Sequence, residues 1–540
     1  MIGAQAMVKC LEAEGVKAVF GYPGVAIAPF YNAMLESDVD SVLVRTEQNA
    51  GHAASGYYRV SGQVGVCAVT SGPGATNLIT GIATAFADSI PMVAITGQVK
   101  SDLIGSDVFQ EADITGAVES FVKYSYLIKD VEDIPRVFKE AFYIANTGRK
   151  GPVLIDVPID IQNATLKKFN YPKEVSLRTY KPTVKGHIMQ IKKLSKALER
   201  AKRPIVCAGG GVLLSDASKE LAAFVEKFNI PMVHTMMGKG ALRSDHRLNY
   251  GMVGNNGKPY ANRAMNDSDL LIMIGARVAD RAISQPDLVM ENKILIHVDV
   301  DPAEIGKNVE STIPIVGDAK TILSDILEQE INCNHQEWVD ELENIRANSK
   351  PTRKPKPEFV DPAEFIKILT EEMSEDGIYV ADVGQNQMWS AANAIVKSGK
   401  FLTTGGMGTM GYSIPAAMGA RKILGKGTDI VAVCGDGSFQ MSFMELATIN
   451  QHDLPVKIII LKNGYLGMVR EYQHYNYNDK YSVVDLSGSP DVEKLSAAYG
   501  IDFVRLHNMS DVRNKIKEFL NKPGSGLMEC VIDPEDLVKY

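Results

Sequence analysis

The chain alternates short, continuous apolar runs with longer segments of helical periodicity. Such runs are typical of strands buried on both faces of a parallel sheet, and the segments between them of helices that cover the sheet. The rhythm predicts βαβ units and therefore an α/β fold. The clearest runs are residues 17–24, 41–48, 64–74, 91–98, 152–158, 204–211, 269–277, 293–302, 378–385, 430–438, 456–464 and 527–533.

Two polar stretches that contain proline, residues 163–185 and 349–358, interrupt this pattern. Both have the composition of linkers. A chain of 540 residues also exceeds the size of a single hydrophobic core. We therefore expect three tandem doubly wound parallel-sheet domains, at residues 1–165, 186–340 and 359–540.

The amino-acid composition limits the classes of function that this protein can have. Hydrophobic residues make up 45% and charged residues 23%, which is typical of globular proteins, and the net charge of -8 gives no basic surface for nucleic acid. No apolar run approaches the roughly 20 residues that span a bilayer, and the first 15 residues lack the pattern of a signal peptide. The scattered cysteines, without a CxxC pair, favour reduced core residues and a cytoplasmic location. They are Cys10, Cys67, Cys207, Cys333, Cys434 and Cys530.

Candidate ligand-binding residues come directly after the strands of the last domain. This is the expected place, because ligands of doubly wound sheets bind beyond the carboxyl ends of the strands. Gly435-Asp436-Gly437-Ser438 follows one run, and Asn463 follows the next, with 25 residues between Gly437 and Asn463. Glycines allow close approach to a phosphate, and carboxylate and amide oxygens are ligands that Mg²⁺ accepts. Gly-Asp-Gly alone is more often an ordinary turn. The strand-separated asparagine strengthens the functional interpretation.

This spacing resembles the signature of thiamine-diphosphate enzymes, and nearly the whole chain resembles the catalytic subunit of the acetohydroxyacid (acetolactate) synthases. The resemblance implies that Asp436, Asn463 and the carbonyl of Tyr465 bind Mg²⁺. It also implies a pyrimidine-binding first domain, a central FAD-binding domain and a diphosphate-binding last domain. The other residues that it places at thiamine diphosphate are Val383, Gly384, Gln385, Asn386, Gly408, Met410, Gly435, Gly437, Ser438, Gly467 and Met468.

Two of these positions have specific roles in the resemblance. Met410 would be the apolar wedge that bends the cofactor, with the Gly408 carbonyl accepting from its aminopyrimidine. The alternative for Met410 is a core methionine, one of 22 in the chain. Asn386 stands where the synthases usually have histidine, and both residue types can donate to phosphate.

An activating acid is expected in the first domain. Glu47 opens the segment EQNAGHAASGYYR, which resembles the glutamate helix of the family. Burial there is expected to raise the pKa of Glu47 and help it share a proton with the aminopyrimidine. The alternative is a solvated glutamate that opens a helix. The resemblance implies that Glu47 of one subunit meets the last domain of another, in a homodimer or a dimer of dimers.

The central domain lacks the GxGxxG fingerprint, so its residues alone indicate a nucleotide-type fold of unknown ligand. The resemblance implies FAD without a net redox role. A domain that keeps the fold without the ligand is the alternative. The residues implied at the flavin are Arg149, Gly209, Gly210, Gly211, Asn256, Gly275, Arg277, Asp299, Val300 and Asp318.

The substrate pocket matches the family less closely. Phe109 and Gln110 resemble its substrate-side loop, Arg277 its carboxylate-binding arginine, and Met252 a further pocket residue. With Glu47 and Tyr472, the first three form the expected catalytic set. Val25, Ile159 and Tyr472 replace the usual glycine, lysine and tryptophan. Tryptophan favours 2-ketobutyrate over pyruvate as acceptor, so tyrosine is expected to weaken that preference.

The expected activity is that of an acetolactate synthase, a transferase of branched-chain amino acid biosynthesis. It would decarboxylate pyruvate on thiamine diphosphate and condense the hydroxyethyl carbanion with a second 2-keto acid, pyruvate more than 2-ketobutyrate. A small regulatory subunit is a further expected partner; nucleic acid and membranes are not. The alternatives are a related flavin-containing acyl transferase or decarboxylase with another acceptor, and a non-catalytic paralogue that keeps the fold.

Overall fold

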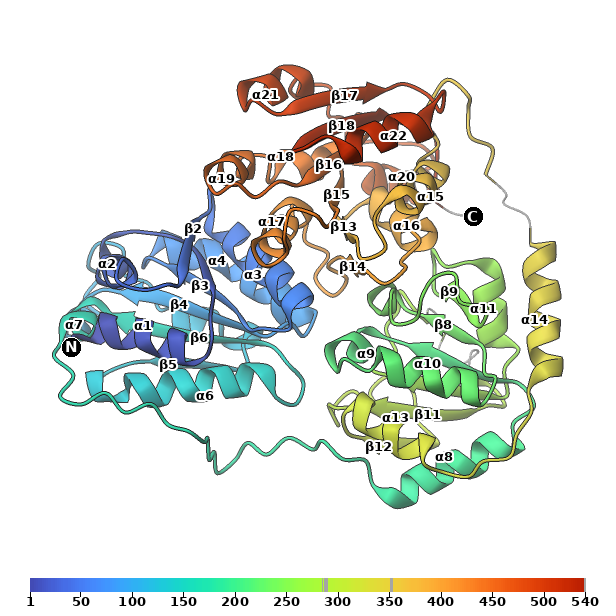
Figure 1. Cartoon of the computed structure of the whole chain (residues 1–540), viewed down its shortest axis with the longest axis horizontal. Helices are drawn as coiled ribbons and strands as arrows, with labels where there is room; N and C mark the ends of the chain where they lie inside the picture. Colours follow the sequence, from blue (N-terminus) through green and yellow to red (C-terminus); the bar gives the residue numbers. More distant parts are fainter. Residues whose placement is uncertain (284, 286–289, 350–352, 539–540) are drawn as a thin grey trace.

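The computed structural model describes residues 1–283, 285, 290–349 and 353–538. Within these residues the chain forms three six-stranded sheets, in which every strand pair is parallel. Helices cover the sheets, and the sheets follow one another in sequence order (Figure 1). The expected fold class is confirmed. The domain boundaries stay a prediction, and residues 350–352 of the second expected linker lie outside the described residues.

The first sheet has the strand order β2-β1-β3-β4-β6-β5. Strands β3, β4 and β6 are buried along their whole length, as the continuous runs predict. The strands are β1 (Ala18–Tyr22), β2 (Asp40–Leu43), β3 (Gly65–Val69), β4 (Met92–Gln98), β5 (Tyr124–Leu127) and β6 (Pro152–Pro158). The helices are α1 (Gly3–Ala13), α2 (Ala28–Met34), α3 (Glu47–Ser61), α4 (Pro73–Ala87), α5 (Ile114–Ala117), α6 (Ile134–Asn146) and α7 (Ile159–Asn163).

The central sheet has the order β12-β11-β10-β7-β8-β9. Residues 164–187 connect it to the first domain as a long segment that runs along the bottom of Figure 1. The strands are β7 (Pro204–Ala208), β8 (Met232–His234), β9 (Asn249–Met252), β10 (Leu270–Ile274), β11 (Ile294–Asp299) and β12 (Ile313–Val316). The helices are α8 (Ile188–Arg200), α9 (Gly210–Leu214), α10 (Ser218–Lys227), α11 (Pro259–Asn266), α13 (Ala319–Leu327) and α14 (Gln336–Asn348).

The third sheet has the order β14-β13-β15-β16-β18-β17. The chain winds to opposite sides from β13 and β15, so the switch point lies between these two strands. The strands are β13 (Ile378–Ala381), β14 (Lys400–Leu402), β15 (Ile430–Gly435), β16 (Lys457–Lys462), β17 (Asp502–Leu506) and β18 (Gly526–Val531). The helices are α15 (Pro362–Glu372), α16 (Gln385–Asn393), α17 (Ser413–Ile423), α18 (Asp436–Gln440), α19 (Glu445–Gln451), α20 (Gly467–Tyr477), α21 (Val492–Ala498) and α22 (Val512–Asn521).

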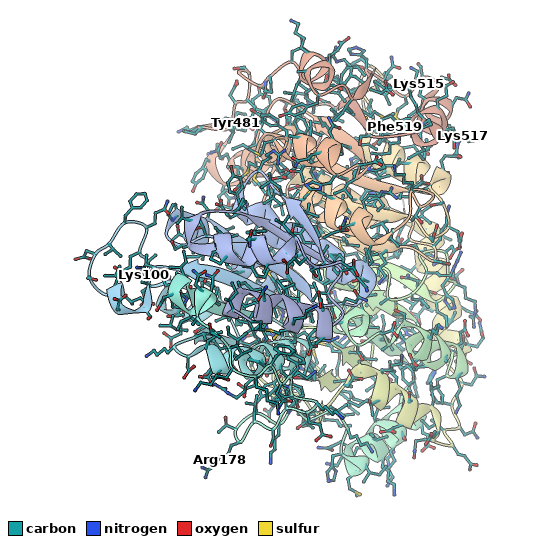
Figure 2. All side chains as sticks on the ribbon, turned by 60° about the vertical axis from the view of Figure 1, so that its left-hand side comes forward. Lys100, Arg178, Tyr481, Lys515, Lys517 and Phe519 are labelled. Carbon is teal, nitrogen blue, oxygen red and sulfur yellow. The ribbon has the colours of Figure 1, made fainter. Side chains whose placement is uncertain are left out.

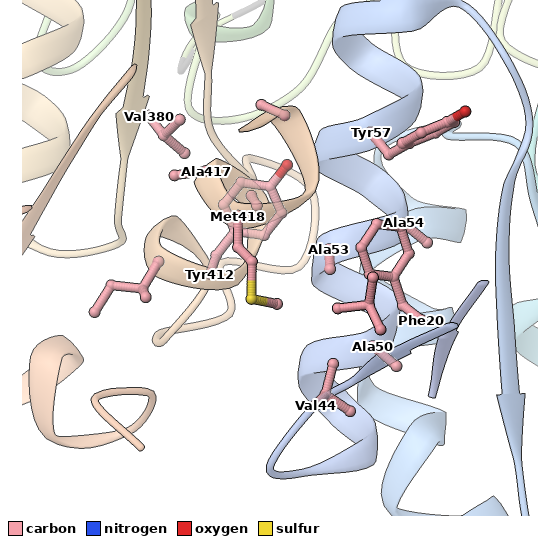
Figure 3. Close-up of a cluster of buried hydrophobic side chains, with 14 of the residues drawn as sticks. Phe20, Val44, Ala50, Ala53, Ala54, Tyr57, Val380, Tyr412, Ala417 and Met418 are labelled. Atoms are coloured by element: carbon pink, nitrogen blue, oxygen red, sulfur yellow. The ribbon is translucent and has the colours of Figure 1, made fainter. Parts of the chain in front are cut away.

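Helices α3 and α17 join the first and third domains. A Cβ atom on Gly56 of α3 would lie 1.9 Å from the Ala416 carbonyl oxygen, and one on Gly419 of α17 would lie 1.9 Å from the Ala53 carbonyl oxygen. The two backbones therefore touch, and neither position has room for a side chain. Figure 3 shows the shared apolar cluster around this crossing, with Phe20 and Tyr57 on one side and residues such as Met418 on the other.

None of the helices in the described residues combines the length and apolar character needed to cross a membrane. All six cysteines are unpaired, and all but Cys333 are buried, so the expected role as core residues is confirmed for five of them.

Candidate functional site

The carboxyl ends of β13, β15 and β16 meet at one edge of the third sheet, because these strands are parallel neighbours. Asp436 follows β15, and its Oδ2 accepts a hydrogen bond from the backbone N–H of Gly464, beyond β16, at 2.8 Å. The structure thereby brings together the Asp436 and Asn463 segments, as their positions after neighbouring strands predict.

Side-chain hydrogen bonds unite the segments that follow these three strands. Asn463 donates from Nδ2 to Gln385 Oε1 at 3.1 Å, and its Oδ1 accepts from the N–H of Tyr465 at 2.9 Å. Gln385 in turn donates to Glu471 of α20 at 2.8 Å. A Cβ on Gly467 would lie 2.1 Å from Gln385 Oε1, so a side chain here would displace Gln385 from its present position. We call this hydrogen-bonded unit the carboxyl edge.

The carboxyl edge contains polar atoms with unused bonding capacity. Asp436 is 5% exposed, and burial raises its pKa to about 6. No ion pair joins it to a cationic side chain in the described part of the chain. Asn386 donates to the Val433 carbonyl, while its Oδ1 is buried without a partner. Among the described residues no group of three or more His, Cys, Asp or Glu could hold a metal ion, so a cation here would need amide, carbonyl and ligand oxygens as well.

Residues 405–411 form a glycine-rich loop beside this edge. The Met410 methyl group would lie 3.4 Å from a Cβ on Gly437, and Gly408 has a positive φ of 70°. We call this segment the glycine loop. It lies close to the Gly-Asp-Gly turn, as the resemblance implies.

Asp382, which the sequence patterns did not single out, links the glycine loop to the end of β13. Its carboxylate accepts from the N–H groups of Gly411 (2.9 Å), Val383 (2.8 Å) and Ser413 (2.7 Å). The side chain is fully buried, and burial raises its pKa. The available signal was an acid directly after a buried run. Ser438, just after the Gly-Asp-Gly turn, donates to the Val383 carbonyl at 3.0 Å and so links that turn to the residues after β13.

Glu47 begins α3, at the first sheet. Its Oε2 accepts from Asn77 Nδ2 at 3.1 Å, and its Oε1 would lie 3.3 Å from a Cβ on Gly74. Both contacts are with the N-terminal part of α4. The expected burial is incomplete, because Glu47 stays partly exposed in the single chain.

The expected substrate residues are spread over all three domains. Phe109 is 88% exposed, and Gln110, with a φ of 60°, packs its backbone against Gly72. Val25 and Tyr472 are also exposed, the first beside β1 and the second on α20. Lys100 is near Phe109 in the sequence, and Tyr481 is near Tyr472. In Figure 2 both labelled side chains project on the same side of the molecule. Ile159 begins α7, and Met252 is buried in β9.

A cavity of about 1310 Å³ lies among the three domains, and we call it the central cavity. Gly209 does not line it but packs against Gly275 and Ala276. The expected flavin and pocket residues that line it are Arg149, Gly210, Gly211, Met252, Asn256, Gly275, Arg277, Asp299, Val300 and Asp318, together with Gly408 and Met468.

Charged side chains of the cavity wall already have partners. Arg149 forms ion pairs with Asp301 (3.1 Å) and Glu304 (2.8 Å), which join the first domain to the central one. Arg277 donates to the Ala87 carbonyl at 3.0 Å. Burial raises the pKa of Asp299 to about 6.

Three regions of the chain match families of thiamine pyrophosphate enzymes. Residues 1–117 match the N-terminal TPP binding domain, residues 191–326 the central domain, and residues 382–530 the C-terminal TPP binding domain.

Similar full-length proteins share one description. The chain is 45% identical to the probable acetolactate synthase large subunit of Methanocaldococcus jannaschii, over 99% of this chain and 93% of the relative. It is 43% identical to the acetolactate synthase of Mycobacterium bovis (96% and 86%), and 41% identical to the acetolactate synthase large subunit of Haemophilus influenzae (96% and 91%).

Proposed function

Because this chain belongs to the acetolactate synthase large-subunit family of thiamine pyrophosphate enzymes, we propose that it condenses two molecules of pyruvate, with loss of carbon dioxide, to 2-acetolactate in branched-chain amino acid biosynthesis. The observation that carries the proposal is the carboxyl edge, where Asp436 and Asn463 stand at neighbouring strand ends. Thiamine diphosphate, when bound, supplies the electron sink that lets a 2-keto acid lose carbon dioxide and join a second one.

Mg²⁺ fits the carboxyl edge. It would be held by the side chains of Asp436 and Asn463 and by the carbonyl of Tyr465, with diphosphate oxygens completing the shell. Magnesium typically binds one or two protein carboxylates together with phosphates, which agrees with the single carboxylate here. A bound cation would also offset the burial of the Asp436 carboxylate. Asn386 Oδ1, buried without a partner, could accept from a water of the magnesium shell.

Glu47 would stabilise the cofactor's imino form, and the geometry of α4 supports its acting across subunits. Glu47 touches α4 near Gly74 and Asn77, whereas the glycine loop of the same chain touches α4 near Thr84 and Ala87. At 1.5 Å of rise per residue these contacts are separated by about 10–20 Å along the helix. In this proposal a second copy brings its Glu47 to the glycine loop. We propose a homodimer, alone or paired, as the active form.

FAD fits the central cavity. The volume of about 1310 Å³ exceeds that of typical small-ligand sites, and Gly210, Gly211 and Gly275 allow close approach of a ligand. Asp299 is the last residue of β11 and would accept hydrogen bonds from ribose hydroxyls, as acids at this position do in nucleotide folds. Arg149 would hold the first domain against the central one at the cavity wall, through its ion pairs with Asp301 and Glu304. In the proposed reaction the flavin has no net redox role.

The acceptor keto acid would bind between domains. Arg277 offers a guanidinium for its carboxylate, and Phe109, Gln110 and Tyr472 would enclose it once a second copy covers their exposed side chains. Pyruvate is the preferred acceptor in this proposal, because Tyr472 lacks the surface of the family's tryptophan. A small regulatory subunit and a cytoplasmic location are parts of the same proposal.

The test uses the purified protein with pyruvate alone. We expect a flavin absorption spectrum and a product that yields acetoin after acid decarboxylation. Glu47→Gln is expected to reduce turnover by about 10²-fold, the lower limit for general acid–base groups. Glu140→Gln is the matched control. Glu140 lies on α6 of the same domain and accepts hydrogen bonds from Tyr126 and Arg136, so the same substitution is made away from the candidate site. Unchanged turnover of the Glu47 variant would instead indicate a different mechanism.

A second candidate is a flavin-containing acyl transferase or decarboxylase with another acceptor. The exposed Val25, with Ile159 and Tyr472, favours it, since all three change the expected pocket. Release of acetaldehyde from pyruvate, without acetoin after acid treatment, would support this candidate.

A further inference from the structure

A buried aspartate at the C-terminal end of α4 holds the glycine loop of the third domain. The Asp88 side chain is 1% exposed. Its Oδ1 accepts from the backbone N–H groups of Gly405 (3.2 Å) and Gly406 (2.8 Å), and its Oδ2 accepts from Arg59 Nη2 at 3.0 Å. One carboxylate of the first domain thus fixes two consecutive peptide groups of the third.

The end of α4 makes further contacts with the same loop. The hydroxyl groups of Thr84 and Thr409 share a hydrogen bond of 2.7 Å. A Cβ on Gly406 would lie 2.7 Å from the Ala87 carbonyl oxygen, so the loop backbone lies directly on the helix end. Arg277 donates to that same carbonyl. The loop is therefore held at three of its seven residues by a helix from another domain.

A glycine-rich segment has little conformational preference of its own, so its geometry must come from its contacts. Hydrogen bonds from N–H groups to an ionised carboxylate are stronger than neutral ones, and Arg59 compensates the buried charge. We infer that Asp88 is a positioning residue that sets the conformation of residues 405–411 and so places Gly408 and Met410 against the cofactor. This inference rests on the proposed function, which puts thiamine diphosphate at this loop.

The test compares Asp88→Ala and Asp88→Asn with the unchanged protein. Asparagine keeps one acceptor for the glycine N–H groups, whereas alanine keeps none. For Asp88→Ala we expect the Kd of thiamine diphosphate to rise about tenfold to a hundredfold, the range for hydrogen bonds to a charged group, with a smaller rise for Asp88→Asn. We also expect kcat for pyruvate to fall with little change in KM, and the near-UV circular dichroism band of the bound aminopyrimidine to weaken.

Lys400→Met is the matched control. Lys400 donates to the Arg59 carbonyl at 2.8 Å and joins the same two domains without touching the glycine loop. We expect it to lower the melting temperature and leave cofactor affinity and the dichroism band unchanged. If both Asp88 variants behave like this control, Asp88 is only a tether between domains and the inference is wrong. If the protein without substitutions binds no thiamine diphosphate, the proposed function is wrong instead.

Discussion

The carboxyl edge of the third sheet and the central cavity are built in opposite ways. The edge is compact and internally hydrogen-bonded: Asp436 accepts from the Gly464 backbone N–H, Asn463 donates to Gln385, and Gln385 donates to Glu471. The cavity is a space of about 1310 Å³ whose wall comes from all three domains. A compact site leaves a short motif in the sequence, whereas a site of scattered wall residues is found only after the domains have been assembled.

Removing the carboxylate of the edge has the largest expected effect. Asp436→Asn loses the charged ligand for Mg²⁺, so we expect turnover of pyruvate to fall by at least about 10²–10³-fold, the size seen when one preorganised contact at a reacting centre is lost. Isothermal titration with Mg²⁺ and thiamine diphosphate checks the cause. Asp376→Asn, exposed at the other end of the same sheet, is the control. Normal turnover of the Asp436→Asn variant would show that the carboxyl edge is not the catalytic centre.

Mixing two inactive variants tests whether the edge is completed by a second copy. A hybrid of Glu47→Gln and Asp436→Asn subunits contains one intact and one doubly altered site. Random pairing of equal amounts in a twofold dimer should therefore restore about a quarter of normal activity. Co-expression with two affinity tags allows the hybrid to be purified and assayed. Activity no higher than that of either parent would place Glu47 and Asp436 of one chain in the same site.

The cavity is expected to respond to pH through Asp299. Its pKa is raised to about 6, so it is largely protonated below that pH and ionised above it. Ribose hydroxyls donate to the ionised form, so we expect FAD affinity to increase by about tenfold between pH 5 and 7. Without ligand the sign is reversed: a raised pKa stabilises the fold at low pH, and this contribution is lost as the pH rises through about 6. Flavin fluorescence and thermal unfolding measure the two effects.

Asp299→Asn should flatten both pH profiles, whereas Asp325→Asn on α13 of the same domain should preserve them. An unchanged pH dependence in the Asp299 variant would show that another group of the cavity titrates.

The smallest expected effect concerns the acceptor. Tyr472→Trp adds apolar surface to α20, so we expect the product ratio to shift by a few-fold to about tenfold toward the product formed with 2-ketobutyrate as acceptor, in the range for one methylene group. Competition between both acceptors, with product analysis, measures the ratio. Tyr124→Trp, an equally exposed tyrosine on the first sheet, serves as control. A strong preference for 2-ketobutyrate in the unchanged protein would contradict the assignment of Tyr472.

Sequence patterns predicted the inner strands well because these strands are continuously apolar. β3, β4 and β16 are buried almost throughout, and each coincides with an expected run. The edge strands β5 and β17 were not singled out, because their residues are half exposed and their pattern is mixed.

The same reasoning explains which site residues the sequence revealed. Asp436 and Asn463 carry a recognisable spacing after two apolar runs. Asp382 and Asp88 carry none, since each acts on backbone N–H groups of the glycine loop or the turn after it, 29 or more positions away. Backbone donors leave no trace in residue identity, so apart from the position of Asp382 directly after a buried run, only the folded chain identifies such acids.

The crossing at Gly56 and Gly419 has a consequence for how this protein can be recombined. With carbonyl oxygens in the place of side chains at both contacts, each helix is shaped to the backbone of the other, and not to a replaceable set of side chains. A chimera that takes the first domain from one relative and the third from another must match both glycines and both backbone paths. The central domain enters through residues 164–187 and packs Leu214 against the apolar cluster, but the backbone atoms nearest to Gly56 and Gly419 come from the third and first domains. The two glycine contacts must therefore be inherited together, so the first and third domains form one unit in any recombination.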